Sequence, residues 1–135
     1  MYLDAVMDEV AARLGEIAGL RVYSWPPGSV TPPAAVVGYP TTYRYDATYG
    51  RGQDTMSLPV VVVVGRPTDR PSRDQLAQYV AGSGPASVKT VLEGGSWSAC
   101  GEVTVTGAEF DVYTLGGTDY LAAIFDLDIA GPGSQ

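Results

Sequence analysis

The chain has 135 residues, of which 45% are hydrophobic and 17% are charged. A chain of this length is typical of one domain, and its apolar content is sufficient for a buried core. Its 8 basic and 15 acidic residues give a net charge of -7, which argues against a protein that binds nucleic acid by neutralising phosphates. We expect a single domain over residues 1–130 and a flexible C-terminal tail over 131–135.

Catalytic and metal-binding side chains are scarce. The chain contains no histidine and one cysteine, Cys100. Without histidine, the Ser-His-Asp and Cys-His arrangements and the usual histidine-containing zinc sites cannot form. A single cysteine excludes an internal disulfide and a cysteine-rich zinc site. The sequence therefore predicts no cofactor and no enzyme activity, although carboxylate-only catalysis stays formally possible.

No segment has the pattern of a signal peptide or a membrane span. The N-terminal apolar pattern is interrupted by Asp4, Asp8 and Glu9, and it lacks a basic start. The longest apolar run, 58–64, is far shorter than the roughly 20 residues of a membrane-spanning helix. We expect a protein that is made in the cytosol and has no membrane partner.

The first third of the chain predicts one helix followed by short strands. Apolar residues recur three and four positions apart from Leu3 to Ala18, the pattern of one helical face, and Gly19 is expected to end this helix. Strands are expected over 20–24 and 34–38, separated by a proline-rich loop that carries Trp25.

The next strands differ in polarity. Residues 43–49 alternate in the manner of a strand with one polar face, and a glycine-containing turn follows at 50–54. The strand over 56–64 is apolar on both sides in its second half, which predicts a position in the middle of the sheet. Because Pro59 has no backbone N–H, the first half of that strand is expected at an edge or a bulge.

Two short helices are expected in the middle of the chain. Ser72 and Gln75 have the spacing of a capping box at the start of the first helix. The second is expected over Ala86–Glu93, with Pro85 in its first turn and Gly94 after its end.

The last third predicts a β-hairpin. Strands are expected over 102–106, 109–115 and 120–129, with a two-residue turn at Gly116 and Gly117. This turn places Val112 opposite Leu121, Phe110 opposite Ala123, and Tyr113 opposite Tyr120. The predicted fold class is α/β (α+β), with a mixed, mainly antiparallel sheet packed against the N-terminal helix and the two short central helices.

Two patterns invite a chemical interpretation. Asp126 and Asp128 share one strand face, as a general acid/base pair, a weak cation site or an ordinary solvated face would; the solvated face is favoured because antiparallel strands commonly alternate in this way. Residues 82–90 partly match a phosphate-binding loop, but Val88 stands where that motif needs glycine and a helix precedes the segment. A turn between two helices is the favoured interpretation.

Aromatic and arginine side chains near the loops are candidate contact residues. Tyrosine, tryptophan and arginine combine apolar area with polar groups and are enriched at protein interfaces, although core packing or an aromatic ligand platform would use the same residues. The candidate subunit or partner interface comprises Trp25, Tyr43, Tyr45, Tyr49, Arg51 and Trp97.

Nearly the whole chain resembles the tail terminator proteins of long, non-contractile-tailed phages (siphoviruses), especially those of actinobacteria. The resemblance lies in the order of the segments, beginning with the N-terminal helix, and not in an invariant chemical motif. The segments that carry it are 20–23 with the following Pro-Pro loops, 34–38, 45–52, 58–66, 81–89 and 117–129.

This resemblance implies a virion protein that forms a ring, typically a hexamer, on the head-proximal end of the tail tube. The ring ends tail polymerisation and joins the tail to the head, so the implied partners are other copies of the chain, the major tail tube protein and a head-closure or connector protein of the neck. Genomic DNA would pass through the lumen without tight binding, and Asp126 and Asp128 are candidates for its acidic face. The alternatives are another neck component, such as a head-closure or connector-adaptor protein, and a small-ligand or nucleotide-binding module that uses the Arg51 loop and the tyrosine-rich strand over 43–49.

Overall fold

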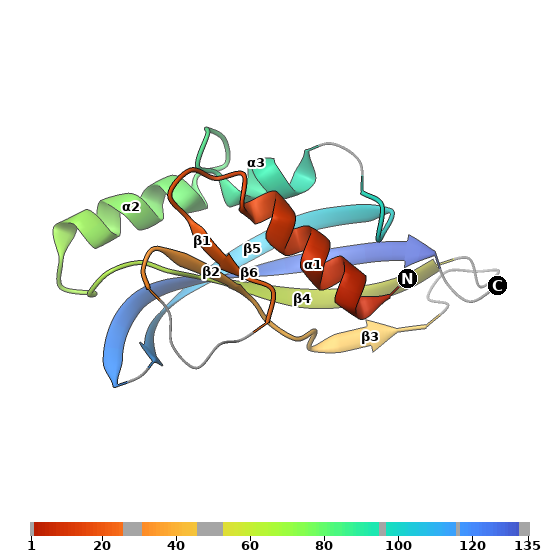
Figure 1. Ribbon diagram of the computed structural model, residues 1–135, viewed down its shortest axis with the longest axis horizontal. Coiled ribbons are helices and arrows are strands. Elements are labelled where there is room, and N and C mark those ends of the chain that lie inside the picture. The colour runs from red at the N-terminus through yellow and green to blue at the C-terminus, as the bar shows by residue number, and fades with distance from the viewer. Residues whose placement is uncertain (1, 26–30, 46–52, 95–96, 116, 133–135) are drawn as a thin grey trace.

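The computed structural model describes residues 2–25, 31–45, 53–94, 97–115 and 117–132, which form one α+β domain (Figure 1). The elements in chain order are α1 (Leu3–Leu14), β1 (Arg21–Tyr23), β2 (Ala34–Val37), β3 (Thr42–Arg44), β4 (Gln53–Val63), α2 (Arg70–Val80), α3 (Val88–Glu93), β5 (Glu102–Leu115) and β6 (Thr118–Pro132). The predicted fold class is confirmed. No helix within the described ranges is both long and apolar enough to cross a bilayer.

The strands form one mixed sheet in the order β1-β2-β4-β6-β5, and β3 pairs with β4 beside β2. β1 and β2 are parallel, whereas every other pair is antiparallel. The hairpin register is as predicted, with Phe110 opposite Ala123 and Val112 opposite Leu121. Positive φ is required at the turn, where Gly117 has a φ of 82°.

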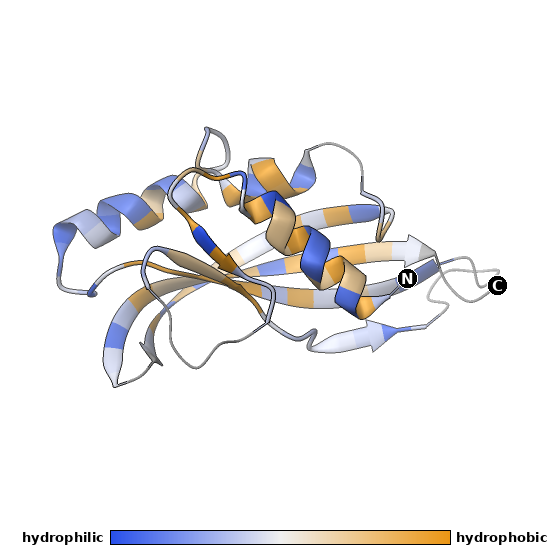
Figure 2. Ribbon diagram, in the orientation of Figure 1, coloured by the Kyte–Doolittle hydropathy of each residue, from blue (hydrophilic) through white to orange (hydrophobic). Residues whose placement is uncertain are grey.

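All three helices pack on one face of the sheet and bury one large core (Figure 1). The core lies on one face because apolar and polar residues alternate along the strands, as Figure 2 shows for β6. Leu127 and Ile129 point into the core, whereas Asp126 and Asp128 are exposed on the other face. A smaller buried cluster of Val61, Val63 and Ala122 lies outside this core, so the second half of β4 is covered on both sides as predicted.

The helix boundaries differ from the predicted ones. α1 ends at Leu14, and turns continue to Gly19, which has a φ of 79°, so Gly19 does not itself end the helix. α2 begins at Arg70 after Asp69, and Ser72 is buried inside its first turn, so the predicted capping box is wrong.

The third helix is shorter than predicted. α3 begins after Ser87, whose Oγ accepts a hydrogen bond from Thr90 N at 3.2 Å. Pro85 therefore precedes the helix and does not lie in its first turn. Residues 82–87 are the predicted turn between the two helices.

Two further predictions need correction. The first half of β4 is not an edge, because it pairs with β3 on one side and β6 on the other. Pro59 lies between the segments that pair with β2 and β3, and its carbonyl accepts a hydrogen bond from Gly38 N at 2.9 Å. Its missing N–H therefore removes no bond between two regular strands. Gly131 and Pro132 pair with β4 as the end of β6, so they are not part of a tail, and 133–135 lie outside the described residues.

Candidate functional site

The most distinctive surface is the sheet face opposite the helices, where five exposed carboxylates project from β5 and β6. We call this surface the acidic face; its residues are Glu102, Glu109, Asp111, Asp126 and Asp128. The register places Asp111 opposite Ala122 and Glu109 opposite Ile124, in the same alternation as the two aspartates of β6. Residues 101–132 contain no lysine or arginine, so no basic side chain of these two strands balances the carboxylates.

A β-bulge assembles this face. The pairing of β5 with β6 shifts register between Val105 and Gly107, which inserts one extra residue into β5. Before the bulge Val103 and Val105 are buried on the helix side, and after it Ala108 takes that side. Glu102 and Glu109 consequently share the exposed face.

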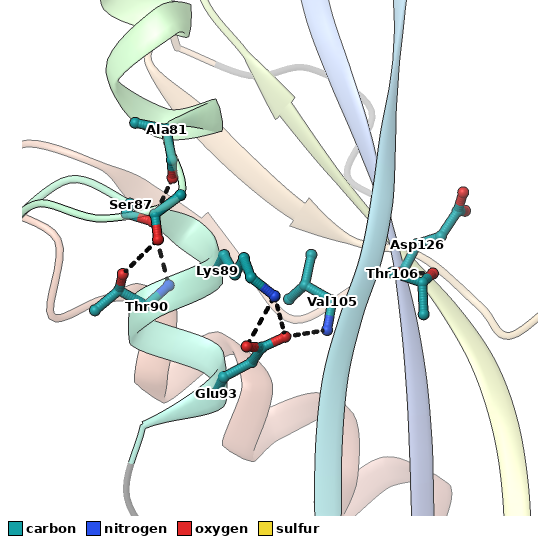
Figure 3. A network of polar contacts seen from close by, with 9 residues as sticks. Ala81, Ser87, Lys89, Thr90, Glu93, Val105, Thr106 and Asp126 are labelled. Atoms are coloured by element: carbon teal, nitrogen blue, oxygen red, sulfur yellow. Dashed lines mark hydrogen bonds and ion pairs between the residues drawn. The ribbon is translucent and has the colours of Figure 1, made fainter.

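Figure 3 shows the two sides of β5 at this point. Val105 lies toward α3, and its N–H donates to Glu93 Oε2 at 2.8 Å. Lys89 Nζ donates a hydrogen bond to the same Glu93 oxygen at 2.7 Å. These hydrogen bonds lower the pKa of Glu93, and the one from Lys89 contributes most. Thr106 lies on the opposite side, where its Oγ1 donates to Asp126 O at 3.1 Å (Figure 3).

Part of the acidic face borders a shallow depression of about 380 Å³. Its walls include Arg44 from β3, Glu102 from β5 and Asp128 from β6, with the hydroxyl groups of neighbouring threonines and Ser57 between them. Among the described residues, no group of three or more His, Cys, Asp or Glu side chains is placed to hold a metal ion.

The structure brings only some of the predicted contact residues to the surface. Trp25 and Tyr45 are 62% and 77% exposed, whereas Tyr43 is half-buried and donates from its hydroxyl to Asp54 Oδ2 at 3.0 Å. The Tyr43 and Tyr45 rings are in contact, with centroids 4.9 Å apart. Tyr49 and Arg51 lie outside the described residues.

Trp97 makes its main contacts within the chain. Its half-buried ring packs against the core, and the Arg13 guanidinium lies 4.6 Å from the ring centroid. Arg13 also donates from Nη1 to Gly94 O at 2.7 Å. These contacts attach α1 to the loop before β5, which leaves little of Trp97 available to a partner.

Glu9 strengthens the same attachment. Its carboxylate accepts hydrogen bonds from Ala99 N at 2.8 Å, from Ser98 N and from Ser98 Oγ. Partial burial raises the pKa of Glu9, but these hydrogen bonds and the charge of Arg13 outweigh burial and lower it. Burial, followed by the charge of Glu9, raises the pKa of the neighbouring Cys100 thiol to about 11.

Three members of the acidic face, Glu102, Glu109 and Asp111, were not predicted from the sequence. A strand that alternated regularly through 102–115 would place Glu102 and Glu109 on opposite faces. The available signal was Gly107, since a glycine inside a strand often marks a bulge.

A scan against protein-family models finds none that matches the chain, and a search of curated proteins finds no significant relative.

Proposed function

We propose that the protein is a structural subunit of a phage virion, a tail terminator that forms a ring on the head-proximal end of the tail tube. In this role the ring ends tube polymerisation and provides the surface to which the neck of the head attaches. Its partners are other copies of the chain, the major tail tube protein and a head-closure or connector protein. The resemblance in segment order and the surface properties described above support this role.

The acidic face is the observation that carries the proposal. DNA that passes through a ring must not be held by its wall, and carboxylates repel phosphates. The part of this sheet face that β5 and β6 form has five carboxylates and no basic residue, which is the charge that such a wall needs. The helices cover the opposite face, and all five carboxylates are exposed, so this part of the face can line a lumen.

Removing the protein tests the proposal directly. Deletion of its gene from the phage that encodes it is expected to yield tails of uncontrolled length, measured by electron microscopy, and a plasmid copy of the gene is expected to restore normal length. Tails of normal length in the deletion would contradict the terminator role.

Binding of the purified protein distinguishes the terminator from other neck components. A terminator is expected to bind isolated tail tubes that lack it. Binding to DNA-filled heads in preference to tubes would instead indicate a head-closure or connector-adaptor protein.

A further inference from the structure

The two edges of the sheet carry opposite charge. β1 is one edge strand and β5 is the other, and neither has a strand partner on its outer side within the described residues. Residues 20–25 and 31–45, which contain β1, β2 and β3, include two exposed arginines, Arg21 and Arg44, and no acidic residue. The opposite edge, β5, bears three carboxylates and no basic residue.

The edge residues also match one another across the sheet. Following the strand pairing from β1 through β2, β4 and β6 to β5 connects each β1 residue with one residue of β5. The resulting rows join Arg21 with Asp111, Val22 with Phe110, and Tyr23 with Glu109. The residue types within the first two rows are complementary, a cation with an anion and an apolar side chain with an apolar side chain.

The β5 edge has unpartnered apolar surface as well as charge. Phe110 is 61% exposed and Val112 is 47% exposed on the helix side of the strand. Phe110 lies beside a groove of about 530 Å³ with nearly wholly apolar walls, formed with Leu76, Val80 and Leu121. Large exposed apolar side chains on an edge strand are typical of a strand-pairing surface.

We propose that the β1 edge of one copy of this chain pairs with β5 of the next copy, along the part of β5 after the bulge, around Glu109–Asp111. β1 and β5 run in opposite directions, so a second copy in the same orientation adds its β1 antiparallel to β5. In the register of the rows, Arg21 of one copy lies beside Asp111 of its neighbour and Val22 beside Phe110. Such cross-strand pairs stabilise sheets.

Charge favours this head-to-tail contact over a symmetric one. Two β5 edges brought together would oppose carboxylates, and two β1 edges would oppose arginines, which disfavours both. A contact between two different surfaces repeats from copy to copy and generates a ring when the rotation closes. The β1–β5 contact assigns the surfaces that would build the ring of the proposed function, and to that extent it rests on that function.

Charge reversal with mixing tests the contact. In R21E every contact opposes two acids, and in D111R every contact opposes two arginines. Each variant alone is expected to raise the dissociation constant for self-association by about tenfold or more. An equimolar mixture is expected to assemble, because the glutamate introduced by R21E meets the arginine introduced by D111R at one contact, and Arg21 meets Asp111 at the next. The double variant R21E/D111R is expected to assemble alone.

Sedimentation velocity over a range of concentrations provides the measurement, with thermal unfolding to confirm that each variant is folded. D8R, which alters an exposed charge on α1, is the matched control and should assemble like the unaltered chain. Rising salt should weaken assembly of the unaltered chain. A chain that stays monomeric, single variants that assemble normally, or a mixture that fails to assemble would overturn the inference.

Failure of this contact and failure of the proposed function are distinguishable. If the edges are wrongly assigned, the unaltered protein still ends tail growth while R21E and D111R assemble normally. If the function is wrong, tails keep their length without the protein while the charge swap behaves as expected.

Discussion

Glu102 and Glu109 project from the same face of β5, although their spacing would place them on opposite faces of a regular strand. The register shift between Val105 and Gly107 reverses the alternation of every later residue in β5. The same shift puts Phe110 on the helix side of the edge. One bulge thus determines both the extent of the acidic face and the apolar part of the β5 edge.

Two single-residue deletions should locate the extra residue of the bulge. Deletion of Thr106 removes that residue and leaves Val105 and Gly107 on their present faces, so it should cost only about 1 kcal/mol, the loss of the hydrogen bond to Asp126 O. Deletion of Thr104 instead turns Val105 out of the core and Thr106 into it. We expect this second deletion to lower the free energy of unfolding by about 2 to 3 kcal/mol.

Urea denaturation measures both deletions. The control T106A keeps the bulge and loses only the hydrogen bond of the hydroxyl, so it should resemble the Thr106 deletion. Equal losses in the two deletions would mean that the extra residue is not Thr106.

Tyr43 should make the fold sensitive to high pH. Burial, together with the hydrogen bond to Asp54 and the charge of Asp54, raises the pKa of Tyr43 from 10.0 to about 12. The neutral phenol therefore stabilises the fold fully below pH 10, and this contribution is lost as the pH rises from 10 to about 12. Y43F lacks both the hydrogen bond and the titration, so it should be less stable by about 1 to 2 kcal/mol at neutral pH and lose less stability above pH 10.

Denaturant unfolding at several pH values measures the Tyr43 effect. Y39F is the control, because Tyr39 is 63% exposed and should behave like the unaltered chain. The prediction would be contradicted if Y43F lost as much stability above pH 10 as the unaltered chain does.

Glu9 should have the opposite pH dependence. Its pKa is lowered from 4.5 in the folded chain, so the carboxylate contributes stability above pH 4.5 that is lost as the pH falls through the lowered folded value. E9Q removes the charge that accepts from Ser98 and Ala99, and we expect it to cost about 1 kcal/mol at neutral pH. The difference between E9Q and the unaltered chain should shrink in acid. D8N, at an exposed neighbouring position on α1, is the control and should cost little.

Local patterns predicted the hairpin well because its register depends on alternation and on a two-glycine turn, which are both visible in the sequence. Contacts between distant segments leave no such local pattern. Tyr43 donates a hydrogen bond to Asp54 on a neighbouring strand, and the Arg13 guanidinium of α1 lies over the Trp97 ring. Neither aromatic residue is therefore simply a surface side chain. The start of α2 was placed too late because Ser72 and Gln75 match a capping spacing that the helix, beginning at Arg70, does not use.

The acidic face leads to a functional prediction at Asp126 and Asp128. Both side chains are exposed on β6, and no basic residue on β5 or β6 balances them. If this face lines the lumen, the double change D126K/D128K replaces two negative charges with two positive ones in every subunit of the ring. Phosphates would then bind the wall through counterion release, and genome ejection should slow or stall.

Ejection triggered in vitro and followed by release of dye-accessible DNA measures this effect. The control D8K/E16K makes the same change of charge at exposed positions in α1 and just after it, away from the acidic face, and should eject like the unaltered phage. The slowing should diminish as salt rises, because phosphate binding of this kind weakens with ionic strength. Normal tails with unchanged ejection in D126K/D128K would show that the acidic face does not meet DNA. Unchanged ejection would also remove the observation that carries the terminator proposal, and deletion of the gene would then be the remaining test of that role.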